Sequence, residues 1–186
     1  MFGVVDLEQA LVFGSSGLNW NECRDEASEI YIADFLKGKG EWDSPLREFE
    51  VPDYTFEIVL DYGAWRQLHR HRMLTMISQP LTTKLGYRVP ALIREAGLDS
   101  RFNSAMHLAD VCYDSLRKIN PALASYLVTH AHHRRCMVKV NLRELHHLKR
   151  LRTSIRAHES IRWVVQDMVN QVWRVHKQLI QPEEQE

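Results

Sequence analysis

The spacing of apolar residues changes along the chain and predicts a mixture of helices and strands. Apolar residues recur three or four apart in residues 19–36 and again in the last long segment, which is the spacing of a helix with one buried face. Between Phe49 and Leu60 they stand mostly two apart, as in a strand. Pro52 interrupts that period, so we expect a bulge or an edge position there. The pattern favours an α+β fold that is mostly helical.

Prolines and capping residues set the expected boundaries. Pro80 limits a helix that begins near Asp61 or Tyr62 to residues before 79, because proline disfavours helical backbone in the residue before it. Thr153 and Ser154 could cap the last helix. The expected helices are 19–36, the segment from 61 or 62, 90–95, 100–119, 121–130, 141–151 and a last one that reaches about residue 179. Residues 134–140 are expected as a strand or connector, and 81–89 as a loop or irregular strand.

Length and composition predict a single cytoplasmic domain over residues 1–186, with a frayed tail at 181–186. Lys plus Arg equals Asp plus Glu at 24 each, and this neutral balance argues against a nucleic-acid partner. Charged residues interrupt every apolar run, which argues against a membrane span, and no leader pattern follows Met1. The odd number and wide spacing of the three cysteines indicate free thiols in a reducing compartment; they are Cys23, Cys112 and Cys136.

Two basic clusters could bind an anionic or heteroaromatic ligand. In the first, Gln67, Arg70 and His71 lie three and four apart, so a helix would present an amide and two nitrogen-rich side chains on one face. Arginine suits a phosphate because its planar fork donates two parallel hydrogen bonds. The second cluster comprises Asn141, Arg143, His147 and Arg152. Either cluster could instead be the solvated face of a helix.

Three motifs, in order, resemble the flavin-dependent thymidylate synthases, also called thymidylate synthase complementing proteins. Arg70-His71-Arg72-x-x-Thr75 is similar to their signature Arg-His-Arg-x-x-Ser. Their C-terminal motif resembles Asn141-Leu-Arg143-x-Leu, followed by Leu151-Arg152 and Ala157-x-x-x-Ile161. Upstream, Gly40-Glu-Trp-Asp-Ser44-Pro45 stands where the family has a Gly-His-Glu-Thr-Pro-like loop. The resemblance covers most of the chain, from about residue 16 to 162.

The resemblance implies the family's fold, with a long antiparallel sheet, and its reaction. Members of the family are homotetramers with active sites between subunits, and they make dTMP from dUMP. The methylene comes from methylenetetrahydrofolate and the hydride from reduced FAD, which NADPH reduces again, so no cysteine nucleophile is needed. By motif position, the residues expected to line FAD are Ser44, Arg70, His71, Arg72, Thr75, Asn141, Arg143 and His147. Those expected to approach dUMP are Gln67, Arg70 and Arg152.

The chain departs from the family where typical members hold the nucleotide. Ser78, Pro80 and Thr82 replace a Glu, a Ser and an Arg, and Ser125 replaces a second phosphate-binding Arg. A hydrogen bond to a charged group contributes about 1.5–3 kcal/mol, so the loss of two such arginines would weaken dUMP binding by roughly 3–6 kcal/mol. In the last motif, His147, Arg156 and His158 stand for Asn, His and Gln. The residues that could replace the lost charge are Lys84, Arg88, Arg134 and Arg135.

Several interpretations therefore remain open. The chain could be one half of a two-domain enzyme whose companion domain completes the site, or a catalytically degenerate scaffold or partner domain of the same fold. A small nucleic-acid binder is a third class, opposed by the neutral charge. His130, His132 and His133 invite a metal interpretation, although exposed or stacking histidines are favoured. Trp42 occupies the place of a flavin-proximal His and could stack on the flavin.

Overall fold

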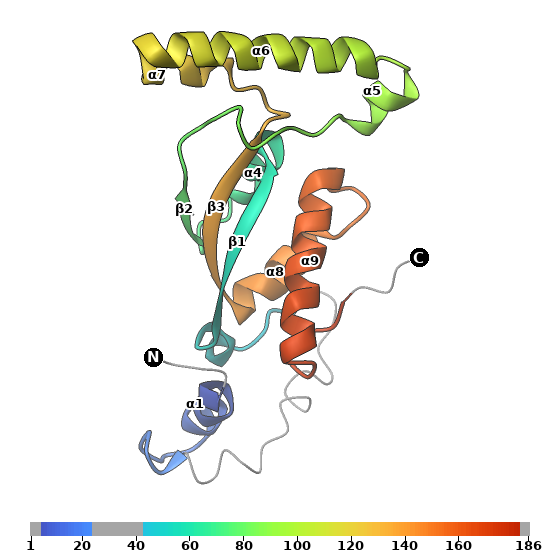
Figure 1. Ribbon diagram of the computed structural model, residues 1–186. Coiled ribbons are helices and arrows are strands. Elements are labelled where there is room, and N and C mark those ends of the chain that lie inside the picture. Colours follow the sequence, from blue (N-terminus) through green and yellow to red (C-terminus); the bar gives the residue numbers. More distant parts are fainter. Residues whose placement is uncertain (1–4, 24–42, 183–186) are drawn as a thin grey trace. The chain divides into compact units, whose positions relative to one another are not determined.

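The computed structural model describes residues 5–23 and 43–182, and its elements are helices and a small sheet (Figure 1). The α-helices are α1 (Val5–Ser15), α4 (Tyr62–Leu68), α5 (Ala91–Glu95), α6 (Asp99–Ile119), α7 (Pro121–Ala124), α8 (Leu142–Arg152) and α9 (Glu159–Val175). The 3₁₀ helices are η1 (Arg47–Glu50) and η2 (Ser125–Leu127), and the strands are β1 (Asp53–Asp61), β2 (Thr75–Ser78) and β3 (His133–Asn141). The α+β class is as expected, and none of the described helices could cross a membrane.

The sheet is small rather than long, which corrects one expectation. Its three antiparallel strands lie in the order β1-β3-β2, and β2 has only four residues. Phe56, Ile58 and Leu60 of β1 are buried while alternate residues are exposed, so the period-two pattern is real. The strand begins only after Pro52, however, and Phe49 lies in η1 with its side chain fully buried. Pro52 has no N–H for a ladder, but its carbonyl accepts a hydrogen bond from the Leu142 backbone.

The chain divides into two compact units. Unit 1 comprises residues up to 56, residues 72–75 and residues from 138 onward. Within it, η1 contacts both α1 and α8, α8 contacts α9, and the Phe49 side chain of η1 is fully buried. On α8 and α9, apolar residues at helical spacing are buried; they are Leu142, Leu145, Leu148, Ile161, Val165, Met168 and Val172.

Unit 2 comprises residues 57–71 and 76–137 and contains α4 to α7. Its core joins Tyr113 of α6 to Ala124 and Val128, with Leu81 packed against them. The 21-residue α6 ends at Asn120, whose side chain accepts hydrogen bonds from the first backbone N–H groups of α7. Pro121 stands in the first turn of α7, as expected, but the helix stops at Ala124 instead of residue 130.

Two helix boundaries differ from expectation. The helix capped by Asp61 ends at Leu68, and residues 75–78, inside the expected helical range, form β2. The last helix is capped by His158, whose Nδ1 accepts from the Ser160 backbone, rather than by Thr153 or Ser154, and it ends at Val175. Residues 75–78 therefore pair with β3 as a strand instead of continuing the predicted helix.

The N-terminal part contains a helix that the sequence did not predict, α1, and a set of capping hydrogen bonds at Asn19. The Asn19 side chain accepts hydrogen bonds from the Asn21 and Glu22 backbones, and the Glu22 carboxylate accepts one from the Asn19 backbone. This reciprocal pair is a capping box, as expected for a helix start at Asn19. The rest of the range predicted as a helix, residues 24–36, and Trp42 lie outside the described residues.

Candidate functional site

A pocket of about 600 Å³ lies within unit 1. Small-molecule and cofactor sites typically occupy about 300–1,000 Å³, so this pocket is large enough for a ligand of that class. Its lining residues come from the segment before η1, from η1 itself, from Met73 and from one side of α8. They are Asp43, Ser44, Pro45, Glu50, Met73, Asn141, Arg143, Glu144, His146, His147, Lys149 and Arg150.

Helix α8 can line the pocket because its two faces differ in polarity. Leu142, Leu145 and Leu148 are fully buried in the core, which leaves the intervening polar positions for the pocket. Asn141 fixes where the helix starts, since its Oδ1 accepts a hydrogen bond of 2.8 Å from the Glu144 backbone. The cap uses the amide oxygen, so the amide N–H₂ is the part of Asn141 available for a ligand.

Arg143 holds the wall of the pocket together. Its Nη1 lies 2.5 Å from Glu50 Oε1, and its Nε donates a hydrogen bond of 2.9 Å to the Pro45 carbonyl. The hydrogen bond from Arg143 is the main reason that the pKa of Glu50 lies below its ordinary value, and Arg47 at 3.6 Å adds to the effect. One guanidinium thus ties α8 to η1 and to the segment before it.

The remaining polar groups of the pocket carry both signs of charge. Lys149 and Arg150 stand in the last turn of α8, and Glu144 stands in its first turn. Arg150 Nη2 lies 3.4 Å from His147 Nδ1, and His146 Nε2 lies 2.9 Å from the Leu179 carbonyl. Imidazole, amide and cationic donors therefore lie on one helix, a set that suits a phosphorylated heteroaromatic ligand.

The structure brings together half of the residues expected to line FAD. Ser44, Asn141, Arg143 and His147 all line the unit 1 pocket. Arg72 and Thr75, in the same unit, are exposed and do not line it, whereas their neighbour Met73 does. Arg152, expected near dUMP, is half-buried at the end of α8 and is also not a lining residue.

Sequence reasoning missed several lining residues. Glu50, Met73, His146, Lys149 and Arg150 were not expected at the site. The last three follow the polar spacing of α8, so the helical pattern could have indicated them once Asn141 and His147 were chosen. Glu50 had no such signal, because it was expected to lie in or beside a strand.

The other expected residues belong to unit 2 and are arranged differently from the prediction. Gln67 lies in α4, but Arg70 and His71 follow the end of the helix at Leu68. The Arg70 backbone donates to the Gln67 carbonyl and the His71 backbone to that of Leu68, in a turn. The expectation that one helix face presents these three side chains is therefore wrong.

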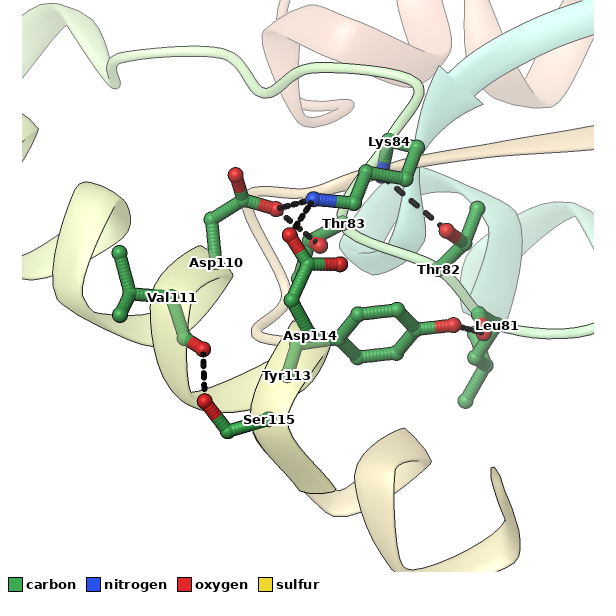
Figure 2. Close-up of polar contacts among 9 residues, drawn as sticks. All are labelled: Leu81, Thr82, Thr83, Lys84, Asp110, Val111, Tyr113, Asp114 and Ser115. Atoms are coloured by element: carbon green, nitrogen blue, oxygen red, sulfur yellow. Dashed lines mark hydrogen bonds and ion pairs between the residues drawn. The ribbon is translucent and has the colours of Figure 1, made fainter. Parts of the chain in front are cut away.

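The basic residues of unit 2 have different partners. Lys84 Nζ lies 2.7 Å from both Asp110 and Asp114, which anchors the loop after β2 to α6 (Figure 2). These hydrogen bonds raise the pKa of Lys84, and the bond from Lys84 is the main reason that the pKa of Asp110 is lowered. Arg135 Nε lies 3.4 Å from Glu57 Oε1, within ion-pair distance but without a hydrogen bond. Arg134 instead lies over the Trp65 ring, with its guanidinium carbon 4.0 Å from the ring centroid.

The clustered histidines point to different groups. His132 is buried, and its Nδ1 accepts a hydrogen bond from the Thr129 backbone; burial lowers its pKa. His133 Nδ1 lies 3.0 Å from the Leu85 carbonyl, and the His130 ring meets the edge of Tyr62. The three rings thus contact three different groups.

Cys136 is not an activated nucleophile, although two arginines precede it in sequence. Its side chain is buried in β3, and burial raises the pKa of the thiol to about 11. Because the thiolate is the reactive form, Cys136 has little nucleophilic character at neutral pH.

Comparison with known proteins identifies the family. The profile of the family described as thymidylate synthase complementing protein matches residues 10–176. A UPF0159 protein of Chlamydia muridarum (strain MoPn / Nigg) is 38% identical over 130 residues, which are 70% of this chain and 25% of that protein. A UPF0159 protein of Thermoplasma acidophilum is 33% identical over 135 residues, 72% of this chain and 27% of that protein. This chain thus spans about a quarter of the length of the curated relatives that it matches. Because the family profile covers nearly the whole sequence, the chain belongs to the thymidylate synthase complementing protein family.

Proposed function

We propose that the chain is a flavin-binding domain of a thymidylate synthase-like methyltransferase, and that the unit 1 pocket holds FAD. The observation that carries the proposal is the meeting of Ser44, Asn141, Arg143 and His147 around one pocket of cofactor size. The proposed substrates are dUMP, methylenetetrahydrofolate and NADPH, in a homotetramer or with a companion domain.

The donor set of the pocket fits a flavin nucleotide. Lys149 and Arg150 provide cations for a diphosphate, and the Asn141 amide and the His147 ring provide directional hydrogen bonds for a ring system. Met73 adds an adaptable apolar surface. Arg143 is already held by Glu50 and the Pro45 carbonyl, so its role is to shape the wall and not to serve as the main phosphate ligand.

When bound, reduced FAD supplies the hydride for the transfer of the methyl group. The residues of this chain bind and orient it. Lys149 and Arg150 would neutralise the phosphates and Asn141 would donate from its amide nitrogen, while the contacts of Arg143 with Glu50 and the Pro45 carbonyl hold the segment beside Ser44.

The absorbance spectrum of the purified chain tests the cofactor proposal. A flavin spectrum after gel filtration, or saturable uptake of added FAD, is expected. His147→Ala should weaken FAD binding about three- to tenfold, the loss of one neutral hydrogen bond. His107→Ala, an exposed α6 position in unit 2, is the matched control and should bind like wild type. Colourless protein that takes up no FAD would refute the proposal.

A second candidate is a partner domain that completes sites together with another domain. It is favoured by the length of the relatives, in which the matched part is only 25% and 27% of the protein, and by Pro80, Thr82 and Ser125 at nucleotide positions. It predicts no dUMP-dependent oxidation of NADPH by the chain alone, and activity on mixing with the remainder of such a protein. Full activity of the isolated chain would exclude it.

A further inference from the structure

Arg134, near the start of β3, is a partly buried cation in unit 2. Its Nε donates a hydrogen bond of 3.2 Å to the Gln79 carbonyl, and its guanidinium carbon lies 4.0 Å from the Trp65 ring centroid and 5.7 Å from that of Tyr62. Burial lowers the pKa of Arg134, although an arginine stays charged in any protein at neutral pH. Among the described residues, no carboxylate forms an ion pair with it. Arg134 is thus a partly buried cation that is stabilised by a carbonyl and an aromatic ring and not by a carboxylate.

The neighbouring cations differ from Arg134 because they already have partners. Lys84 is shared by two carboxylates of α6 (Figure 2), and Arg135 is paired with Glu57. Arg88 has an interaction of its own as well. Among Lys84, Arg134 and Arg135, whose contacts are described, Arg134 is therefore the one without a carboxylate at ion-pair distance.

The contacts of Arg134 fix the side chain without using its fork. The guanidinium carbon lies 4.0 Å from the centroid of the Trp65 ring, and the Nε hydrogen is donated to the Gln79 carbonyl. The two terminal nitrogens carry four more hydrogens and make no hydrogen bond to the described residues. Trp65 is itself held in place. Its Nε1 donates a hydrogen bond of 2.9 Å to Ser78 Oγ, and the His69 ring stacks on it with 4.7 Å between the ring centroids. A fork held in advance loses less conformational entropy when an anion binds.

The charge of unit 2 also favours an anion. Unit 2 contains ten Lys and Arg residues against six Asp and Glu residues, although the whole chain is neutral. A local excess of positive charge raises the concentration of anions near the surface.

We propose that Arg134 is an anion-binding residue that takes the phosphate of a nucleotide through its terminal nitrogens. The two terminal nitrogens of a guanidinium can donate two parallel charge-assisted hydrogen bonds, which match the geometry of a phosphate. The contact with the Trp65 ring helps to hold the guanidinium in place. That the nucleotide is dUMP rests on the proposed function, whereas the phosphate specificity does not.

The test compares Arg134→Gln with Arg135→Gln, two adjacent arginines of which one is paired with a carboxylate. Binding of dUMP and of deoxyuridine, which lacks the phosphate, is measured by titration calorimetry at low ionic strength. We expect Arg134→Gln to weaken dUMP binding about tenfold to a hundredfold, the loss of a charge-assisted contact, and to leave deoxyuridine binding unchanged. Arg135→Gln should stay within about twofold of wild type, since its partner is Glu57. Equal losses in the two variants, or an equal loss for dUMP and deoxyuridine, would overturn the proposal.

Arg134→Lys covers the case in which the glutamine variant does not fold. It keeps the charge but not the fork, so its dUMP affinity should fall by less than that of the glutamine variant while the circular dichroism spectrum is kept. Wild-type affinity in a folded Arg134→Lys protein would show that the fork is not used and would count against the proposal.

Inorganic phosphate separates this inference from the proposed function. Binding of phosphate is followed by broadening of its ³¹P resonance in wild type and in both glutamine variants. Broadening that depends on Arg134, in a protein that binds no dUMP, would leave the inference standing and refute the substrate. If Arg134→Gln bound dUMP as tightly as wild type does, the inference about Arg134 would be refuted and dUMP would stand as the substrate. Absence of both kinds of binding would refute the two together.

Discussion

Replacement of Arg143 by Gln tests whether this residue is a structural tie or a ligand contact. The change removes the guanidinium that joins Glu50 and the Pro45 carbonyl to α8. If Arg143 mainly shapes the wall, the variant should lose stability even without any cofactor. If it mainly contacts FAD, the variant should be as stable as wild type and only bind FAD more weakly.

The size of the expected loss follows from the two contacts. A hydrogen bond that involves a charged group contributes about 1.5–3 kcal/mol, so two of them set an upper limit of roughly 6 kcal/mol. The Glu50 pair is partly exposed, with side-chain exposures of 33% and 29%, and solvent screening reduces an exposed ion pair to about 0–1 kcal/mol. We therefore expect a loss of about 2–4 kcal/mol, which would lower the urea midpoint by roughly 1–2 M if unfolding is two-state.

Urea unfolding at several pH values measures this loss and its cause. The pKa of Glu50 is lowered in the folded protein, so the contribution of its carboxylate is complete above the ordinary value of 4.5 and is lost as the pH falls through the folded pKa. The difference between wild type and Glu50→Gln should thus be constant near neutral pH and shrink below pH 4.5. Glu95→Gln, on α5, is the control, because Glu95 has no ion pair among the described residues. An Arg143→Gln protein that unfolds within about 0.5 kcal/mol of wild type would refute the structural role.

Three further predictions concern other parts of the chain. Asn141→Ala should lower the free energy of unfolding by about 1 kcal/mol through loss of the α8 cap, and Asn141→Asp, which can still cap, should lose little of it; urea titration compares them, and equal losses would contradict the cap. Lys84→Met should speed hydrogen exchange in the backbone of residues 81–89, as mass spectrometry would report, because the loop loses its two links to α6; unchanged exchange would show that the links are dispensable. In the folded protein a thiol reagent should label Cys112, which is exposed, while Cys136, with a pKa of about 11, should react only on unfolding; early labelling of Cys136 would contradict its burial.

The parts of the fold that the sequence predicts well are those decided by local chemistry. Helix α6 stops where Asn120 and Pro121 stand, α4 starts at its Asp61 cap, and α8 starts at its Asn141 cap. In each case one side chain, or the missing N–H of a proline, fixes the boundary without help from distant residues.

The parts that the sequence does not predict depend on partners far along the chain. Residues 75–78 follow a helical region in sequence but form β2, because a strand is stable only with a neighbouring strand to bond. Phe49 shares the alternating pattern of β1 but lies in η1, where its side chain is buried. A period-two pattern cannot show where pairing begins, and Pro52 marks that point here.

In the candidate site, too, some features could be predicted from local sequence and others depend on residues far along the chain. The family motifs predict that Ser44, Asn141, Arg143 and His147 line FAD; the four side chains do line one pocket, and the binding of FAD there stays a prediction. The motif could not show that Arg143 is occupied by Glu50, since that pairing depends on η1, an element that the sequence did not indicate. A basic residue in a motif can thus shape the wall of a site instead of contacting its ligand.

The charged residues are distributed unevenly between the two units, which the net charge of the whole chain conceals. Neutrality of the full chain argued against any polyanion, yet unit 2 has four more basic than acidic residues, which unit 1 offsets. A nucleic-acid surface needs a row of unpaired cations, because each phosphate contact contributes through the release of a counterion. Lys84 and Arg135 are paired with carboxylates, so the excess does not translate into such a row in their region. An uncompensated guanidinium at Arg134 suits a single phosphate better than a polymer, which is why the pairing of individual residues, and not the net charge, decides the expected partner.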